Sequence, residues 1–310
     1  MNVIQDYPLS KVTTLRIGGP AKQFISVASE DELLEAIKYA KKESLPFLVI
    51  GGGSNLLVAD EGVEKLVIQN KISGIFQNGN ILTVKSGTPL QTVVNLSIEK
   101  GLSGINKLTG IPGTVGGAIY GNAGAYGGGI SENLIDVTCI NPQTGKIIIL
   151  KKEDCGFNYR DSNFKRNGLV IIAATFKLTP GDSQELKKES EEIKLRRDEK
   201  YPPGIKCPGS FYKNLIASDL PEDILKKIPP EKIVYGKIPA GALLEMVGAK
   251  GDHKGSIEIA PYHANLFINN GGGNAKDFYT LAKKYFDKIK EKFGISLEPE
   301  VQLINLAKLN

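Results

Sequence analysis

The sequence has few of the residues on which metal sites, disulfide frameworks and many hydrolases depend. Its 310 residues include 3 cysteines, 2 histidines and no tryptophan. The cysteines, Cys139, Cys155 and Cys207, are odd in number and far apart, which indicates a reducing compartment rather than a disulfide framework. Because His253 and His263 are the only histidines, a multi-histidine metal site or a Ser-His-Asp hydrolase has very little to draw on. We therefore expect no metal.

Long hydrophobic runs are also missing. No apolar stretch approaches the ~18 residues needed to span a bilayer, and residues 1–6 have neither the basic start nor the apolar centre of a secretory signal. We expect a soluble, cytoplasmic protein with no membrane partner. The net charge of +5 is spread among 34 acidic residues, and the densest charged run, residues 187–200, alternates in sign as solvated helix faces do. A nucleic-acid partner is therefore not expected, although the positive excess would help to attract a diphosphate-bearing ligand.

Length and composition indicate a chain that folds throughout and has more than one core. Single cores stop growing near ~250–300 residues, and this chain has 310 residues, of which 41% are hydrophobic and 24% charged, close to globular averages. The strongest break is Tyr201-Pro202-Pro203-Gly204, which ends a charged helix that begins after Asp182. We predict a domain boundary near residues 180–200.

Hydrophobic periodicity predicts a mixture of helices and strands. Residues 29–43 have apolar side chains at helical spacing, and Ser29 with Glu32 forms a capping box at their start. Residues 141–145 have the composition of a hairpin turn. The same reasoning predicts helices at 90–100, 242–247 and 275–293, and strands at 46–50, 56–58, 81–84, 169–176, 265–269 and 300–306.

Two glycine-rich loops are candidates for binding a phosphate. They cover residues 51–55 and 113–124, and glycine-rich turns can direct backbone N–H groups at an anion. Neither the G-x-G-x-x-G pattern that opens a helix in Rossmann domains nor the P-loop pattern occurs in this sequence. Either loop alone could be a plain tight turn. Two ordered loops, both close to strands, favour a dinucleotide held without a Rossmann domain.

Three segments carry a resemblance to a known family. They are TLRIGG at 14–19, VIGGGSNLL at 49–57 and GIPGTVGG at 110–117. They resemble the FAD-binding segments of the UDP-N-acetylenolpyruvoylglucosamine reductases, and the similarity extends from about residue 10 to residue 306. Many proteins of the same fold attach the flavin to a histidine after the first of these segments. Pro20 stands there in this chain, so the resemblance implies non-covalent FAD.

The resemblance implies an α+β fold. It implies a vanillyl-alcohol-oxidase/PCMH-like, two-part FAD-binding domain, with subdomains at 1–65 and 66–195, followed by a smaller α+β substrate-binding domain at 196–310. The compact C-terminal third is similar to the shorter, type II subgroup, which lacks an inserted tyrosine loop. The implied FAD contacts are Arg16, Ile50, Gly51, Gly52, Gly53, Ser54, Asn55, Leu56, Gly110, Pro112, Gly113, Thr114, Gly116, Gly117, Gly121, Asn122 and Ala123.

Three further segments resemble the family's catalytic motifs: YRDS at 159–162, GSFYKN at 209–214 and LEPEV at 297–301. The resemblance implies Arg160 and Glu300 as catalytic residues and Ser210 as the proton donor. Each has a simpler explanation, because Arg160 could be a surface ion-pair residue, Ser210 a turn residue and Glu300 a solvated strand edge. The substrate-binding residues implied in the same way are Tyr126, Tyr159, Lys200, Lys213, Asn214 and Asn265. As alternatives, the lysines could be solvated, Tyr126 could belong to the core, and Asn265 could satisfy backbone groups.

The family's reaction gives these residue types a common purpose. NADPH reduces FAD, hydride passes from flavin N5 to the terminal enolpyruvyl carbon of UDP-N-acetylglucosamine enolpyruvate, and protonation of the α carbon yields UDP-N-acetylmuramate. The intermediate is anionic, so a fixed cation and hydrogen-bond donors would stabilise it. The resemblance thus implies a flavoprotein oxidoreductase of peptidoglycan synthesis, involved in cell-wall biogenesis, cell shape, cell division and the cell cycle. We expect a monomer that binds these small molecules.

Two alternatives remain open from the sequence. One is an oxidase of the same FAD fold, which the missing tethering histidine and the set Arg160, Ser210 and Glu300 argue against. The other is a non-catalytic module that binds a flavin or a nucleotide sugar, which would be favoured if only the glycine loops matched. The sequence departs from the family at Leu215, where proline is usual, and lacks a tryptophan common near Ala242.

Overall fold

The computed structural model describes residues 2–309. Within that span no helix combines the length and the apolar character that a membrane crossing requires. The chain divides into two compact units. Unit 1 consists of Met1–Tyr7, Ala21–Gly53 and Glu64–Glu199, and unit 2 of Pro8–Pro20, Ser54–Val63 and Lys200–Asn310. Two short N-terminal segments therefore fold with the C-terminal third of the chain.

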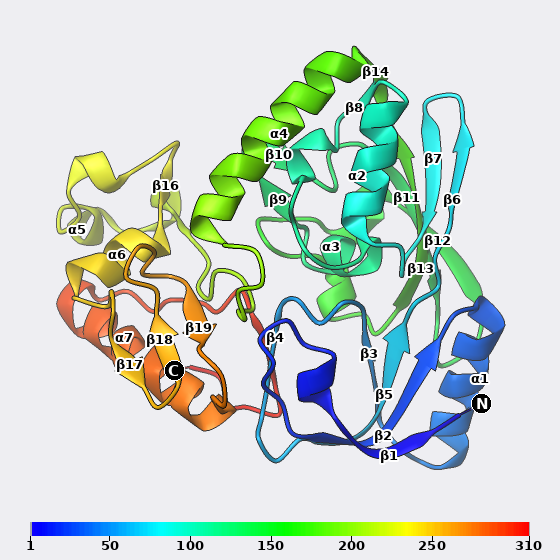
Figure 1. Cartoon of the computed structure of the whole chain (residues 1–310), viewed down its shortest axis with the longest axis horizontal. Coiled ribbons are helices and arrows are strands. Elements are labelled where there is room, and N and C mark those ends of the chain that lie inside the picture. Colours follow the sequence, from blue (N-terminus) through cyan, green and yellow to red (C-terminus); the bar gives the residue numbers. More distant parts are fainter. Residues whose placement is uncertain (1, 310) are drawn as a thin grey trace. The chain divides into compact units, whose positions relative to one another are not determined.

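The first sheet of unit 1 has four strands and one covering helix, α1 (Glu30–Lys42) (Figure 1). In sheet order the strands are β1 (Ile4–Pro8), β2 (Pro20–Val27), β5 (Val63–Asn70) and β3 (Phe47–Ile50), with β3 parallel to β5. The predicted cap is present in part, because the Ser29 side chain accepts from Glu32 N at 3.2 Å, whereas Glu32 Oε2 accepts at 2.6 Å from Ala28 N, one residue before the cap. The buried face of α1, which includes Leu33 and Ile37, packs in one cluster with residues of β5.

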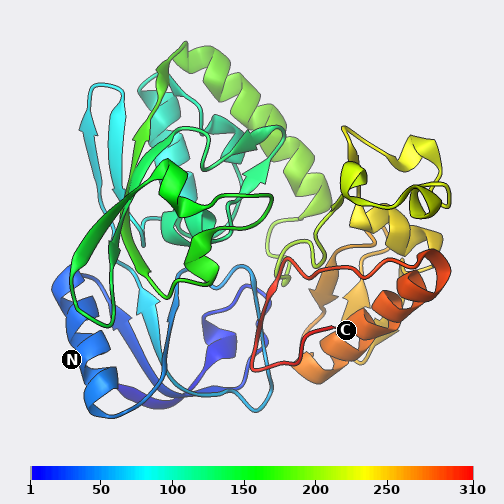
Figure 2. The same cartoon turned by 180° about the vertical axis from the view of Figure 1, so that it is seen from behind.

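The second sheet of unit 1 is antiparallel and has five strands. Its order is β12 (Ile147–Lys151), β11 (Leu134–Ile140), β13 (Val170–Lys177), β7 (Ile81–Lys85) and β6 (Ile75–Asn78). The apolar run predicted to be a central strand is β13, whose first five residues are buried. The hairpin between β11 and β12 turns at the predicted place, where Gly145 N donates to Asn141 O at 2.8 Å. Figure 2 shows this sheet from behind, in cyan and green.

Three helices and two small sheets complete unit 1. Helices α2 (Leu90–Glu99) and α3 (Val115–Tyr120) contribute to the same core cluster as the five-stranded sheet. Helix α4 (Ser183–Lys200) is the charged helix that the sequence predicts. The small sheets pair β8 (Leu102–Ser103) with β14 (Thr179–Pro180), and β9 (Gly124–Ala125) with β10 (Gly128–Gly129).

Unit 2 is built around the long helix α7 (Ala275–Phe293), drawn in orange to red in Figure 1. The ring of Phe211, on the 210–212 segment, makes tilted contacts with the rings of Phe267 and Phe278, with centroids 5.3 and 5.2 Å away. The other helices are α5 (Glu222–Leu225) and α6 (Ala240–Met246). Two pairs of strands form in this unit: β20 (Gln302–Ile304) with β4 (Leu56–Val58), and β15 (Leu215–Ile216) with β16 (Lys237–Ile238). A third sheet has three strands in the order β17 (His253–Lys254), β18 (Ile257–Ile259) and β19 (Phe267–Asn269).

Helix α7 matches its prediction because both of its ends are specified by the sequence. At its start the Asn274 side chain accepts from Asp277 N at 2.7 Å. At its end Gly294 takes the left-handed conformation, with φ of 77°. A further cap comes from far along the chain, since the Asp60 carboxylate accepts from Ala275 N at 2.7 Å and from Lys276 N at 2.9 Å.

Several elements differ from the prediction, because strands such as β2 and β5 were not predicted and helix α6 begins at Ala240 rather than at 242. The strands expected at 265–269 and 300–306 are shorter, running over Phe267–Asn269 and Gln302–Ile304. The glycine-dense stretch is ordered as expected, but it also contains helix α3, which we did not predict. Its glycines, Gly116 and Gly117, have poor helix propensity and hide the helical pattern.

Candidate active site

Residues 51–53 of the first glycine loop lie against the second glycine loop in unit 1. The first follows β3, and the second leads into α3. A Cβ atom on Gly51 would overlap the Thr114 side chain, and a Cβ on Gly52 would lie 3.1 Å from Gly113 Cα. Gly113 itself has φ of +113°, which only glycine adopts without strain. The sequence therefore has glycines here because the two backbones approach each other directly.

The second loop is fixed to the sheet by backbone hydrogen bonds. Gly116 N donates to Ser86 O at 2.8 Å, and Val115 N donates to Thr88 O at 3.0 Å. The Thr114 side chain caps α3 by accepting from Gly117 N at 3.3 Å. The loop is thus held in place before any ligand binds.

Asn122, at the end of the second loop, presents an unsatisfied acceptor. It has φ of 45°, and its Nδ2 donates to Asn158 O at 2.8 Å. Its Oδ1 atom is buried and has no hydrogen-bond partner among residues 2–309. A buried acceptor without a partner costs about 1–3 kcal/mol, so a donor from a ligand would relieve this cost. The ring N–H and the ribityl hydroxyls of a flavin are donors of this kind, so the glycine cradle and Asn122 fit FAD.

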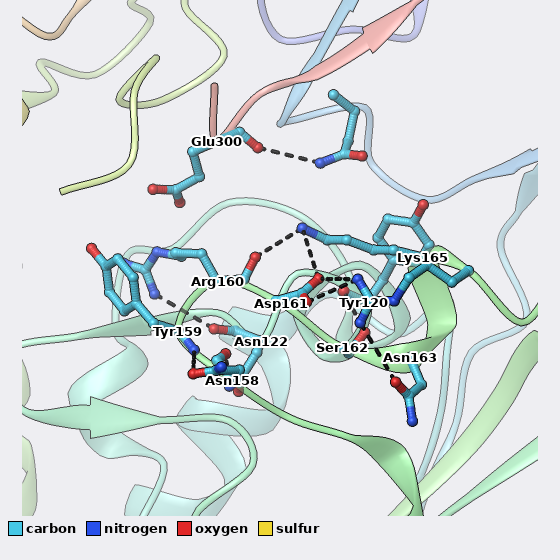
Figure 3. A network of polar contacts seen from close by, with 12 residues as sticks. Tyr120, Asn122, Asn158, Tyr159, Arg160, Asp161, Ser162, Asn163, Lys165 and Glu300 are labelled. Atoms are coloured by element: carbon cyan, nitrogen blue, oxygen red, sulfur yellow. Dashed lines mark hydrogen bonds and ion pairs between the residues drawn. The ribbon is translucent and has the colours of Figure 1, made fainter. Parts of the chain in front are cut away.

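Arg160 lies at the tip of a tight turn, shown in Figure 3. Asn158 and Asp161 exchange backbone hydrogen bonds at 3.1 and 3.0 Å, which leaves Tyr159 and Arg160 at the tip. Arg160 has φ of 52°, an uncommon conformation for a residue with a side chain. The Lys165 ammonium donates to Arg160 O at 2.8 Å and stabilises this conformation.

The guanidinium of Arg160 points to the loop that carries the predicted flavin contacts. Its Nη2 donates to Gly124 O at 2.6 Å, and its Nη1 lies 3.5 Å from Asn122 O. The ring of Tyr159 lies beneath it, with its centroid 5.4 Å from the guanidinium carbon. Both of these acceptors are backbone carbonyls.

In unit 2, Ser210 and Glu300 belong to adjacent backbone segments. Glu300 N donates to Phe211 O at 2.7 Å, and Phe211 N donates to Asn265 O at 2.9 Å. The segment around Ser210 is therefore held between residues 265–266 and 299–300. The carbonyl of Glu300 is held in turn by Asn55 Nδ2 at 3.0 Å.

Three of the residues assigned to the substrate pocket hold the framework of unit 2. The Asn265 side chain is buried, and its amide accepts from Tyr212 N and donates to Tyr212 O, both at 2.8 Å. Asn214 Oδ1 accepts from Ala240 N at 3.1 Å at the start of α6. Lys213 forms an ion pair with Glu298 at 2.6 Å. A substrate role for these residues remains a prediction, because the contacts that they make here are structural.

The other predicted residues are distributed over both units. Arg16 is exposed, has φ of 58° and donates from Nη1 to Lys11 O at 3.0 Å. Tyr126 is 38% exposed with φ of 51°, so the alternative that placed it in the core is wrong. Of the predicted FAD contacts, unit 2 contains Arg16, Ser54, Asn55 and Leu56, and unit 1 contains the remainder. The described part of the chain has no cluster of side chains suited to a metal ion.

Sequence reasoning missed one neighbour of Ser210. The Tyr201 hydroxyl lies 2.8 Å from Ser210 Oγ. Nearby, His263 Nδ1 accepts from Asn265 N at 3.2 Å, and burial, with the charge of Lys200, lowers the pKa of this imidazole below its usual value. The imidazole is therefore neutral near pH 7. Tyr201 directly follows Lys200 in the motif, but no sequence pattern connects it to Ser210.

Two family matches define the class of this protein. Residues 21–151 match a family described as FAD binding domain, and residues 201–304 match the C-terminal domain of UDP-N-acetylenolpyruvoylglucosamine reductase. The chain is an FAD-dependent oxidoreductase, with a vanillyl-alcohol-oxidase/PCMH-like FAD-binding domain and a second α+β domain.

Relatives and a solved structure identify the family. A UDP-N-acetylenolpyruvoylglucosamine reductase of Solibacter usitatus is 38% identical over 298 residues, which are 96% of this chain and 95% of that protein. One from Clostridium novyi is 35% identical and covers 96% of this chain and 90% of that protein. The crystal structure of the Thermus caldophilus enzyme matches with a TM-score of 0.77 at 30% identity, covering 98% of each chain. The chain belongs to the UDP-N-acetylenolpyruvoylglucosamine reductase family.

Adding a methyl group at Gly51 should weaken FAD binding. In Gly51→Ala the new Cβ would overlap Thr114, which must then move and release its cap on α3. Overpacking of this kind costs about 1–3 kcal/mol, so the dissociation constant of FAD should rise about 10- to 100-fold. Titration of apoprotein with FAD, followed by flavin fluorescence, measures the change. Gly181→Ala is the matched control, since its Cβ would meet only ordinary contacts at 3.6 Å and beyond. If the two variants bound FAD with equal affinity, the prediction that the glycine loops hold FAD would be contradicted.

Proposed function

We propose that this chain catalyses the NADPH-dependent reduction of UDP-N-acetylglucosamine enolpyruvate to UDP-N-acetylmuramate. It would do so through non-covalently bound FAD, as a cytoplasmic step of peptidoglycan precursor synthesis. The observation that carries the proposal is the hydrogen bond between the Ser210 and Glu300 segments, in which Glu300 N donates to Phe211 O at 2.7 Å. It brings a hydroxyl-bearing and a carboxyl-bearing residue together in the domain that matches the reductase family.

The proposed chemistry requires stabilisation of an anion and delivery of a proton. When bound, reduced FAD supplies the hydride that adds at the terminal enolpyruvyl carbon. Negative charge then develops toward the substrate carboxylate, where the guanidinium of Arg160 would stabilise it and the carboxyl group of Glu300 would assist. Ser210 would protonate the α carbon. A hydroxyl is a weak acid in water, but a neighbouring carbanion provides the driving force for transfer.

The remaining predicted residues would bind the ligands. In this proposal FAD is held by two subdomains, 1–65 and 66–195, and the sugar nucleotide by the domain at 196–310. Tyr126, Tyr159, Lys200, Lys213, Asn214 and Asn265 would line the substrate pocket. The lysines are suited to the diphosphate because an ammonium group is a compact charge that binds phosphate oxygens. The protein would act as a monomer.

The purified protein tests this proposal directly. It should be yellow, and denaturation should release free FAD, since no histidine follows the first FAD segment to tether it. NADPH should be oxidised at an appreciable rate only when the enolpyruvyl UDP-sugar is present, with UDP-N-acetylmuramate as the product. NADPH and NADH should be compared at equal concentrations. A protein that oxidises small alcohols with oxygen and ignores the enolpyruvyl sugar would contradict the proposal.

A further inference from the structure

Tyr201 and Ser210 form a pair of hydroxyl groups in unit 2. Their oxygen atoms are 2.8 Å apart, the usual length of an O–H···O hydrogen bond. Tyr201 is only partly buried, so water can reach its vicinity. Ser210 follows Gly209, whose φ of +87° turns the backbone into the segment beside Glu300. The position of one hydroxyl therefore depends on the other.

The ring of Tyr201 is held on its apolar faces. It packs against a cluster of three buried residues, Cys207, Ala260 and Leu266. The His263 ring lies beside it, with centroids 6.1 Å apart and planes inclined by 48°. Because this packing restricts both side-chain torsions of Tyr201, it also fixes the position of the hydroxyl group. In that position the hydroxyl contacts Ser210 Oγ.

We propose that Tyr201 positions the Ser210 hydroxyl and returns a proton to it while Ser210 protonates the substrate. This inference rests on the function proposed above. The O–H bond of Ser210 breaks as a C–H bond forms at the α carbon, and the O–H bond of Tyr201 breaks as a new O–H bond forms at Ser210. Water then protonates the Tyr201 phenolate. One solvent proton is consumed for each hydride transferred, so the reduction balances.

Relative acidity favours this direction of transfer. A phenol, with a pKa of about 10, is a stronger acid than an aliphatic alcohol, so a proton moves readily from tyrosine to a serine alkoxide. A contact of 2.8 Å allows the transfer without movement of either side chain. His263 does not replace Tyr201 as the acid, because its Nδ1 accepts a backbone N–H and burial lowers its pKa. Ser210 thus never carries a full negative charge in a partly buried position.

The variant Tyr201→Phe tests the proposal and keeps the ring packed. Flavin reduction by NADPH should stay within about twofold of wild type, while re-oxidation of the flavin by the enolpyruvyl sugar should slow about 10²-fold. The rate of re-oxidation should be measured in mixtures of H₂O and D₂O. The wild-type plot against deuterium fraction should curve, because two protons move together, and the plot for Tyr201→Phe should be linear. A residue with a purely structural role would not change the shape of this plot.

Controls separate this inference from the proposed function. Tyr235→Phe is the matched variant, since Tyr235 is 98% exposed in the same unit, and it should behave as wild type. If Ser210→Ala slows re-oxidation but Tyr201→Phe keeps the wild-type rate and a curved plot, the role of Tyr201 is overturned and the proposed function stands. If Ser210→Ala itself has no effect, the proposed function loses its proton donor. Equal thermal unfolding midpoints for Tyr201→Phe and wild type would confirm that the fold is retained.

Discussion

Replacing Ser210 with alanine should slow re-oxidation of the flavin by the enolpyruvyl sugar by about 10²–10⁴-fold, the usual contribution of a general acid. Flavin reduction by NADPH should remain close to wild type, because hydride transfer from a nicotinamide needs no proton from this hydroxyl. Stopped-flow absorbance of the flavin separates the two half-reactions. The expected loss exceeds that for Tyr201→Phe, since Ser210→Ala removes the donor itself.

The structure offers a clean control for this experiment. Ser218, in the same unit, is exposed, and its hydroxyl makes only a long contact of 3.4 Å with Asp219. Ser218→Ala should therefore leave both half-reactions unchanged. Loss of the Ser210 hydroxyl also removes the partner of Tyr201, so the unfolding midpoint of each variant should be measured. If Ser210→Ala slowed both half-reactions equally, the defect would lie in flavin binding, and the role as proton donor would be wrong.

Local elements were predictable because their signals lie within a few residues of each other. Helix α1 has its cap residues Ser29 and Glu32, and helix α7 has Asn274 before it and Gly294 after it. The central strand β13 is a short, continuous apolar run, which is typical of burial on both faces. Helix α3 was missed because two of its six residues are glycine, so propensity argues against it. It forms because Thr114 caps it and the sheet holds its first turn.

Long-range pairings could not be predicted from the sequence. Strand β20 pairs with β4 in parallel, with Gln302 opposite Leu56, although the two are far apart in the chain. Asp60 caps helix α7 across a similar separation. Neither strand β4 nor the segment around Asp60 has a sequence pattern that identifies the part of the chain it contacts. The N-terminal residues 8–20 and 54–63 fold with unit 2 for the same reason, because strand pairing and capping, not order in the chain, decide which residues pack together.

The site shows the same division between local pattern and spatial contact. Motifs identified Ser210 and Glu300, and the structure adds that a backbone hydrogen bond joins their segments. Motifs also suggested Asn265 for the substrate, while the structure uses both ends of its amide to hold Tyr212. The motifs gave no role to Tyr201, because it lies nine residues before Ser210 and no sequence periodicity predicts a contact between the two hydroxyl groups. Motifs therefore suggest single residues, whereas the contacts between those residues become visible only in the structure.

Arg160→Lys should slow re-oxidation of the flavin by about 10²–10³-fold, the effect of losing one donor that stabilises a developing anion. Lysine keeps the charge but not the planar fork of donors. In wild type, Arg160 Nη2 donates to Gly124 O at 2.6 Å, and Nη1 lies 3.5 Å from Asn122 O. A lysine ammonium has a single nitrogen, which cannot take the positions of both Nη1 and Nη2. Flavin reduction by NADPH should change little, since no anion of this kind forms in that step.

The control for this variant is Arg196→Lys on helix α4. Its side chain is 64% exposed, and its guanidinium pairs with Glu192 at 3.9 Å, so the exchange should leave both half-reactions at the wild-type rate. Arg160 has φ of 52° in wild type, and a lysine would carry the same backbone strain, so folding should not distinguish the two variants. Re-oxidation at the wild-type rate in Arg160→Lys would show that a point charge is sufficient. The fork, which is what the Asn158–Asp161 turn and Lys165 hold in place, would then have no part in the chemistry.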